Sequence, residues 1–212
     1  MIKEEKTMKK VGIIGGTFNP IHLGHLILAE RTFEEFDLDE ILFIPAGISY
    51  FKDQSVVLDK KTRIAMTGEA IGDNPRFALS TIECDRAGNS YTYETLEELK
   101  SKNPDNQYYL IIGADALFQM ELWQKPENIL RDAIILVAKR QGPTTQEFLD
   151  KMEDIKTKYN ADIRVIPCTY IDISSSEIRD RVKNGKSIRY LVPESIEKYI
   201  KKHHLYGYKD TE

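Results

Sequence analysis

Short apolar runs alternate with amphipathic patterns along almost the whole chain. The apolar runs are mostly β-branched or aromatic, which is typical of strands. They predict strands at Lys10–Ile14, Glu40–Pro45, Phe77–Ser80, Tyr108–Ile112, Ala133–Ala138 and Ile163–Ile166. Helical periodicity predicts helices at His22–Phe36, Asp59–Ile71, Thr92–Lys100, Asp115–Met120, Thr145–Tyr159, Ser175–Lys183 and Pro193–His203. Strands that alternate with helices in this way indicate a parallel sheet.

The predicted strands are apolar on both faces. Residues 133–137, for example, read Ala-Ile-Ile-Leu-Val, which suits a strand buried between two layers of helices. We therefore expect an α/β fold in which helices flank both faces of a Rossmann-like parallel sheet. Ligands of such sheets gather at the carboxyl ends of the strands.

No internal repeat and no linker rich in Pro, Gly and Ser divides the chain. We expect one domain over residues 8–206, with a small helical portion from about residue 174. Residues 1–7 are an expected N-terminal extension and residues 207–212 an expected tail. The 212 residues suffice to bury a substantial core.

Charge and composition exclude several classes of protein. The net charge of -4 does not favour a surface for nucleic acid or anionic membranes. No apolar run approaches the ~18 residues needed to span a bilayer, and the charged N-terminus has no apolar signal region behind it. Cys84 and Cys168 belong to no Cys/His cluster. We expect a cytoplasmic protein without a zinc site, and with no nucleic-acid or membrane partner.

A Gly-Gly turn at Gly15 and Gly16 follows the first predicted strand. Two glycines let the backbone turn sharply and let its N–H groups approach a ligand. Asn19-Pro20 marks the helix boundary, and we expect Pro20 at the first helical position. His22 and His25 then lie on one face of the first helical turn, beside its free N–H groups. The segment predicts a site for a nucleotide phosphate.

Simpler interpretations of this segment exist. It could be an ordinary strand-to-helix turn followed by two unrelated histidines, but two of the four histidines lie within one helical turn of it. The spacings of the Walker A loop and of Gly-x-Gly-x-x-Gly are both missing. A zinc site at His22 and His25 lacks a third ligand nearby in sequence.

The run Gly-Gly-Thr-Phe-Asn-Pro at residues 15–20, with His22-x-Gly-His25 after it, resembles the signature of a known superfamily. This is the nucleotidyltransferase superfamily of adenylyl- and cytidylyltransferases, whose members share His-x-Gly-His or Thr-x-Gly-His. Ile173–Arg179 is similar to a second motif of the superfamily, Ile-Ser-Ser-Thr-x-Ile-Arg. Ser176 stands where threonine is usual.

The second motif also has a meaning of its own. Ser174 and Glu177 predict a capping box at the start of a helix. Ser175, Ser176 and Arg179 crowd the first turn of that helix. Alone, the motif would indicate only a capped surface helix. Together with the first motif, it predicts two helix N-termini that face one triphosphate.

Three further segments narrow the resemblance to the nicotinate-mononucleotide adenylyltransferases, a family that joins nicotinate mononucleotide to AMP. Ser90–Thr95 resembles Ser-Tyr-Thr-x-Asp-Thr, with Glu94 in place of the aspartate. Ile111–Asp115 with Trp123 is similar to the Gly-Ala-Asp…Trp segment of that family. Residues 190–206 resemble its C-terminal end. The resemblance thus extends over nearly the whole chain.

The resemblance implies a set of site residues. The implied catalytic residues are His22, His25, Lys52 and Arg179. The implied contacts of the ATP phosphates are Gly15, Gly16, Thr17, Phe18, His22, His25, Ser175, Ser176 and Arg179. The implied contacts of nicotinate mononucleotide are Thr17, Lys52, Thr92, Gly113, Asp115 and Trp123. Mg²⁺ is implied as the cofactor that accompanies ATP, held mainly by the phosphates and not by a metal site of the protein.

The residues implied for the acceptor are chemically suitable for it. Trp123, the only tryptophan, offers a flat face for a pyridine ring, and plain core packing is an equally good interpretation. Thr92 could donate to a carboxylate, or be just a helix residue. Asp115 could bind a ribose hydroxyl, or act only as a helix cap.

One loop departs from the family pattern. The usual Pro-Pro-His-Lys reads Ser-Tyr-Phe-Lys at residues 49–52, so Phe51 replaces the histidine while Lys52 remains to meet a phosphate. A family His-Arg pair reads Thr62-Arg63. The aromatic pair of the loop could form an apolar lid, or suit a slightly different acceptor.

The expected reaction is adenylyl transfer from ATP to nicotinate mononucleotide by direct in-line displacement, giving nicotinate adenine dinucleotide and pyrophosphate. One alternative is phosphopantetheine adenylyltransferase, which shares both phosphate motifs but has a shorter chain and no aromatic platform at Trp123. Another is a non-catalytic nucleotide-binding regulator, made conceivable by Phe51. The intact histidines and Arg179 favour an enzyme.

Overall fold

The structure is a computed structural model that describes residues 8–48, 56–138, 145–167 and 171–209. One six-stranded sheet forms its centre, in the order β3-β2-β1-β4-β5-β6. The strands are β1 (Lys10–Gly16), β2 (Glu40–Pro45), β3 (Phe77–Leu79), β4 (Gln107–Gly113), β5 (Ile134–Ala138) and β6 (Ile163–Ile166). All pairings between neighbouring strands are parallel, as predicted.

Helices connect the strands and cover the sheet. They are α1 (Leu23–Glu35), α2 (Lys60–Ile71), α3 (Ile82–Asp85), α4 (Thr92–Lys102), α5 (Ala114–Gln119), α6 (Pro126–Asp132), α7 (Thr145–Tyr159), α8 (Ser175–Lys183) and α9 (Glu194–Lys202). The 3₁₀ turns η2 (Met120–Leu122) and η3 (Leu205–Gly207) complete them. No helix of the described ranges is long and apolar enough to cross a membrane.

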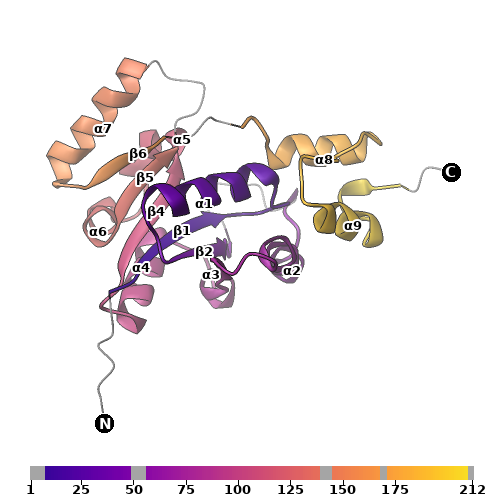
Figure 1. Ribbon diagram of the computed structural model, residues 1–212, viewed down its shortest axis with the longest axis horizontal. Coiled ribbons are helices and arrows are strands. Elements are labelled where there is room, and N and C mark those ends of the chain that lie inside the picture. The colour runs from indigo at the N-terminus through magenta and orange to yellow at the C-terminus, as the bar shows by residue number, and fades with distance from the viewer. Residues whose placement is uncertain (1–7, 49–55, 139–144, 168–170, 210–212) are drawn as a thin grey trace, which may run out of the picture.

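The sheet separates two hydrophobic cores, because alternate residues of each strand point to opposite faces. Ile14, Ile111 and Leu136 belong to the core beneath α1, α2, α8 and α9. Ile13 and Ile135 belong to the core beneath α3 to α7. Figure 1 shows α1 lying along one face of the sheet, and α8 and α9 together at the end near the C-terminus. The expected α/β fold, with helices on both faces, is confirmed.

The strand order places the site. β1 lies between β2 and β4, with Ile13 opposite both Leu42 and Leu110. After β1, the chain adds β2 and then β3 on one side of β1, and it then crosses to the other side of β1 to form β4. The helices after β1 and β4 therefore leave on opposite faces and open a crevice between the two strand ends, where ligands of such sheets bind.

The structure corrects the predicted start of the first helix. Pro20 is not at the first helical position; it lies in a turn, after a cis Asn19–Pro20 peptide. The helix begins at Leu23, because His22 is still extended, with φ -146° and ψ 168°, and acts as the N-cap. His25 is then the third helical residue.

Helices α3 and α6 and both 3₁₀ turns were missed by the sequence patterns. They are too short to show a repeating apolar period. Strand β1 extends to Gly16, beyond the predicted Ile14, because glycine carries no strand signal. The division into domain, extension and tail stays a prediction.

Candidate active site

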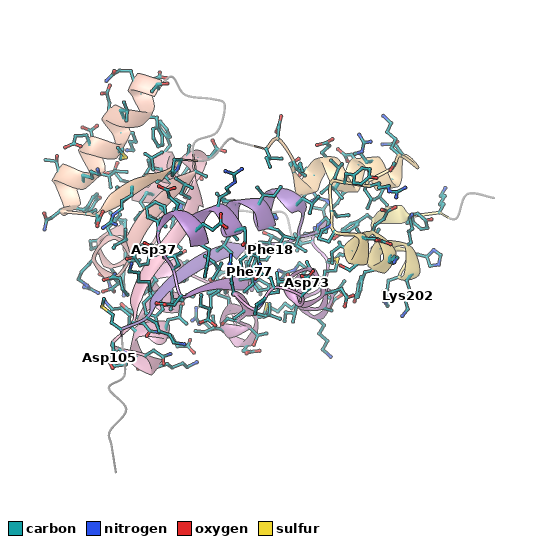
Figure 2. All side chains as sticks on the ribbon, viewed as in Figure 1. Phe18, Asp37, Asp73, Phe77, Asp105 and Lys202 are labelled. Atoms are coloured by element: carbon teal, nitrogen blue, oxygen red, sulfur yellow. The ribbon has the colours of Figure 1, made fainter. Side chains whose placement is uncertain are left out.

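The turn after β1 is built around Phe18. Its backbone has a φ of 47°, in the left-handed region, and its side chain is buried. A Cβ added to Gly16 would lie only 2.8 Å from the Phe18 ring, so the close approach requires glycine there. The ring packs against Phe43, which packs against Phe77, with centroids 6.0 and 5.0 Å apart. Figure 2 shows Phe18 and Phe77 in the interior of the molecule. Only the backbone of Phe18 is left to face a phosphate.

The two histidines lie together, as predicted. Their ring centroids are 3.6 Å apart and the rings are nearly parallel, at 27°. The edge of the Phe18 ring supports His25 at 5.0 Å. The His22 backbone N–H donates to Nδ1 of His25 over 3.3 Å. Since Nδ1 accepts this bond, the proton of a neutral His25 belongs on Nε2.

The start of α8 is bound to the segment before α1. The Ser175 hydroxyl donates to the Pro20 carbonyl over 2.8 Å, and Arg179 Nη1 donates to the Asn19 carbonyl over 3.0 Å. Ser174 caps α8 by accepting from the Glu177 N–H at 3.1 Å, one half of the predicted capping box. The two phosphate motifs, far apart in sequence, are therefore side by side in the fold.

Asn19 joins two further segments at the same place. Its Nδ2 donates to the Val56 carbonyl over 2.9 Å, and its Oδ1 accepts from the Tyr206 hydroxyl at 3.0 Å. Burial raises the pKa of Tyr206, partly offset by Arg179 and Arg63. Tyr206 therefore stays a neutral donor at physiological pH. Sequence reasoning gave neither Asn19 nor Tyr206 a role in the site.

A cavity of about 520 Å³ lies in the crevice between β1 and β4. Gly15, Gly16 and Thr17 line one side of it, and Thr92 and Trp123 also line it. Its other lining residues are Ile13, Ile44, Ala46, Glu83, Ser90, Tyr91, Thr95, Leu96, Leu110, Ile111, Ile112, Ala116, Leu122, Gln124 and Ile129. The structure therefore brings the glycine turn together with two of the predicted acceptor residues.

Trp123 satisfies both interpretations offered for it. The ring is half-buried, packs against the core beneath α3 to α7, and lines the cavity as well. Thr92 is the first residue of α4, so its side chain stands at the N-terminal end of that helix. A flat ring and a hydroxyl at one cavity suit an aromatic ligand with a polar substituent.

Other predicted residues lie outside the cavity lining in the described part of the chain. Gly113, the last residue of β4, is the N-cap of α5, and Asp115 is exposed in the first turn of that helix. The paired histidines and Arg179 lie towards α8 instead. Lys52 and Phe51 lie outside the described residues, so their expected roles stay predictions.

Two charged residues at the site, the buried Arg63 and the half-buried Glu83, were given no role from the sequence, in which Arg63 was noted only as part of the Thr62-Arg63 pair. Arg63 is 2% exposed, and Glu83 lines the cavity and accepts from the Thr95 hydroxyl at 3.0 Å. Burial raises the pKa of Glu83, although the bond from Thr95 and the charge of Arg86 lower it. A signal for Arg63 was present: it shares one helical stripe with Met66, Thr67, Ala70 and Ile71, all buried. A charged side chain at a core position is costly to bury, which indicates that it does more than fill space.

The cytidylyltransferase-like family matches this chain over residues 13–181. That match covers most of the fold and both phosphate motifs, and it defines the class: the chain is a nucleotidyltransferase of this family.

Within the class, the chain belongs to the nicotinate-nucleotide adenylyltransferase family. A protein of Lachnoclostridium phytofermentans, named probable nicotinate-nucleotide adenylyltransferase, is 44% identical over 94% of this chain and 100% of its own length. A protein of Lactiplantibacillus plantarum with the same name is 41% identical over 95% of this chain and 90% of its own.

Solved structures agree with this fold. Nicotinic acid mononucleotide adenylyltransferase of Plasmodium falciparum, complexed with NaAD, superimposes with a TM-score of 0.78 at 21% identity, over 95% of this chain and 98% of that one. Its complex with APC gives a TM-score of 0.76 at 20% identity, with the same coverage. At such identities the likeness shows the fold alone.

Proposed function

We propose that the protein transfers the adenylyl group of ATP to nicotinate mononucleotide, giving nicotinate adenine dinucleotide and pyrophosphate. The observation that carries the proposal is the cavity that joins Trp123 and Thr92 to the Gly15–Thr17 turn. After the turn the chain reaches the paired histidines, which lie near the start of α8, and we expect the triphosphate to bind there. The names and the high identity of the bacterial relatives support the same reaction.

The chemistry is a single in-line displacement. A phosphate oxygen of nicotinate mononucleotide attacks the α-phosphorus of ATP, and the bond from that phosphorus to the bridging oxygen of pyrophosphate breaks. Both the attacking and the leaving group are anions at neutral pH, so the displacement needs neither a nucleophilic side chain nor a general base. Catalysis then depends on positioning and on donors aimed at the charge of the pentacoordinate phosphorus.

The phosphate side supplies those donors. His22 and His25 would donate to the transferring phosphoryl oxygens, with the backbone N–H groups of Gly15, Gly16, Thr17 and Phe18 beside them. Ser175, Ser176 and Arg179 would hold the triphosphate at the start of α8. Arg179 bonds the Asn19 carbonyl and the Ser176 hydroxyl, and a guanidinium has five N–H donors, so donors remain for phosphate oxygens.

The cavity side would hold the acceptor. The pyridine ring stacks on Trp123, and the nicotinate carboxylate receives a hydrogen bond from Thr92. Gly113 and Asp115, at the end of β4, would meet the ribose, while Thr17 and Lys52 would meet the acceptor phosphate. Thr17 belongs to both sides, which suits a residue placed between two reacting phosphates.

Mg²⁺ is proposed to arrive with ATP as part of the substrate. Among the described residues, no three His, Cys, Asp or Glu side chains gather as a metal site. The proposal therefore assigns the ion mainly to the phosphate oxygens and to water. We place the protein in the cytoplasm, a setting that suits the free thiol of Cys84.

The test is an acceptor assay. The protein is mixed with Mg²⁺-ATP and, in separate reactions, with nicotinate mononucleotide, nicotinamide mononucleotide or phosphopantetheine, and pyrophosphate is measured. We expect release with nicotinate mononucleotide above all, since Thr92 and the start of α4 favour a carboxylate. Faster release with phosphopantetheine would overturn the proposed acceptor. No release with any acceptor would indicate a nucleotide-binding regulator.

A further inference from the structure

Arg63 is an unusual core residue. It lies in the first turn of α2, its side chain is among the largest that are fully buried, and it carries a charge. Burial lowers the pKa of the guanidinium, but the unperturbed value is so high that the group stays protonated. A buried charge is costly unless it is well hydrogen-bonded.

Three backbone carbonyls from three segments receive these bonds. Nη1 donates to Thr17 over 2.9 Å, Nη2 to Gly47 over 3.2 Å and Nε to Leu58 over 3.0 Å. Thr17 belongs to the turn that lines the cavity. Along the chain, Gly47 and Leu58 flank residues 49–55, the segment whose sequence departs from the family pattern. One planar group thus holds the turn at Thr17 together with Gly47 and Leu58.

Gly47 is held from its other side as well. A Cβ at this position would lie 2.4 Å from both the Glu83 carbonyl oxygen and the Ser90 hydroxyl oxygen. The next residue, Ile48, accepts from the Ser90 backbone N–H over 3.2 Å. Gly47 is therefore packed between Arg63 and the cavity-lining segment around Glu83 and Ser90.

We propose that Arg63 is a positioning residue for adenylyl transfer: it fixes the glycine turn against Gly47 and Leu58 without touching either substrate. This inference rests on the proposed function. The Thr17 carbonyl and the Phe18 N–H belong to one peptide group, so the guanidinium also polarises that N–H towards a phosphate. Rigid placement of the donors is what an in-line displacement requires.

The main test replaces the planar guanidinium of Arg63 with a group that carries a single point charge. In Arg63→Lys, one ammonium cannot bond three carbonyls in three directions. We expect kcat, measured with both substrates saturating, to fall on the order of ten-fold to a hundred-fold in protein that is still folded. Met66→Ala is the matched control, since it removes a fully buried side chain from the same helix. It should lower the melting temperature and leave kcat unchanged.

Gly47→Ala tests the same contact from the other partner. The added Cβ must push the Gly47 peptide away from Glu83 and Ser90, so we expect the kinetic signature of Arg63→Lys while Arg63 itself is intact. Gly68→Ala, in α2, is its control, because its Cβ would meet only Leu79 at an ordinary 3.4 Å. If Arg63→Lys fails to fold, the comparison of Gly47→Ala with Gly68→Ala still tests the proposed role of Arg63.

The outcomes separate this inference from the proposed function. Wild-type release of pyrophosphate together with unchanged kcat in Arg63→Lys or Gly47→Ala overturns the inference alone. Equal loss of kcat in Met66→Ala and Arg63→Lys would show that only general stability matters, and would also overturn it. A wild-type protein that makes no dinucleotide overturns both proposals. A loss of kcat confined to Arg63→Lys and Gly47→Ala supports the inference.

Discussion

On the α8 side of the site, residues predicted to bind phosphate contact one another and the backbone, whereas on the α4 side Thr92 and Trp123 line an open cavity. Ser175 and Arg179 hold the carbonyls of Pro20 and Asn19, and the rings of His22 and His25 stack. Trp123, in contrast, lies against a cavity of about 520 Å³.

The difference follows from what each side must bind. A triphosphate needs many donors held in fixed directions, and mutual hydrogen bonds between distant segments provide that rigidity. An aromatic acceptor needs an apolar space with few polar groups, and a crevice between two strand ends provides it. Changes on the α8 side should therefore affect turnover, and changes on the α4 side should affect acceptor binding.

The largest expected effect is on the α8 side. His25→Ala should lower kcat on the order of 10²–10³-fold, because it removes a donor aimed at the transition state. His203→Ala, an exposed histidine at the end of α9, is the control and should keep wild-type kinetics. Steady-state kinetics with varied ATP and nicotinate mononucleotide checks the result. A change in KM alone would remove the proposed role of His25 and weaken the contrast between the sides.

On the α4 side, Trp123→Ala should raise the KM for nicotinate mononucleotide by roughly ten-fold, since stacking and burial of a ring are together worth about 1–2 kcal/mol. The KM for ATP and kcat should change much less. Trp123→Phe keeps a flat ring and should recover most of the affinity. Equal increases in both KM values would contradict the assignment of this cavity to the acceptor.

The smallest expected effect is on stability, and it comes from ion pairs of Glu121, a residue close to Trp123 in sequence. Lys151 and Lys158 of α7 each donate over 2.6 Å to Glu121, two residues before Trp123, and lower its pKa from 4.5 to about 2. The ionised carboxylate therefore stabilises the fold above about pH 4.5, and this contribution disappears as the pH falls towards 2. Because the groups are partly exposed, it amounts to about 1 kcal/mol or less.

Urea unfolding of wild type and Glu121→Gln between pH 2 and 7 measures this contribution. The variant should be less stable near neutral pH, and the two curves should meet towards pH 2. A difference in stability that stays constant with pH would show that the ion pairs contribute nothing specific. Turnover should be unaffected, because Glu121 points to α7 and not into the cavity lining.

The sequence predicted the parts of this protein that depend on local pattern. Strand and helix periods indicated the parallel sheet, and two motifs predicted that His22, His25 and Arg179 share a phosphate site. Short elements such as α3 were not predicted, because four residues are too few to show a helical period of apolar residues. The family resemblance, which extends over the chain, supplied the acceptor residues Thr92 and Trp123.

Only the tertiary structure decided which distant groups meet. A buried arginine can be read from the helical stripe of Arg63, but its partners Thr17 and Gly47 are known only once β1, β2 and α2 are packed. The same holds for Tyr206 on Asn19, at opposite ends of the chain. Local sequence sets backbone periods and caps within a few residues, whereas hydrogen bonds across the fold depend on how the sheet order brings strand ends together.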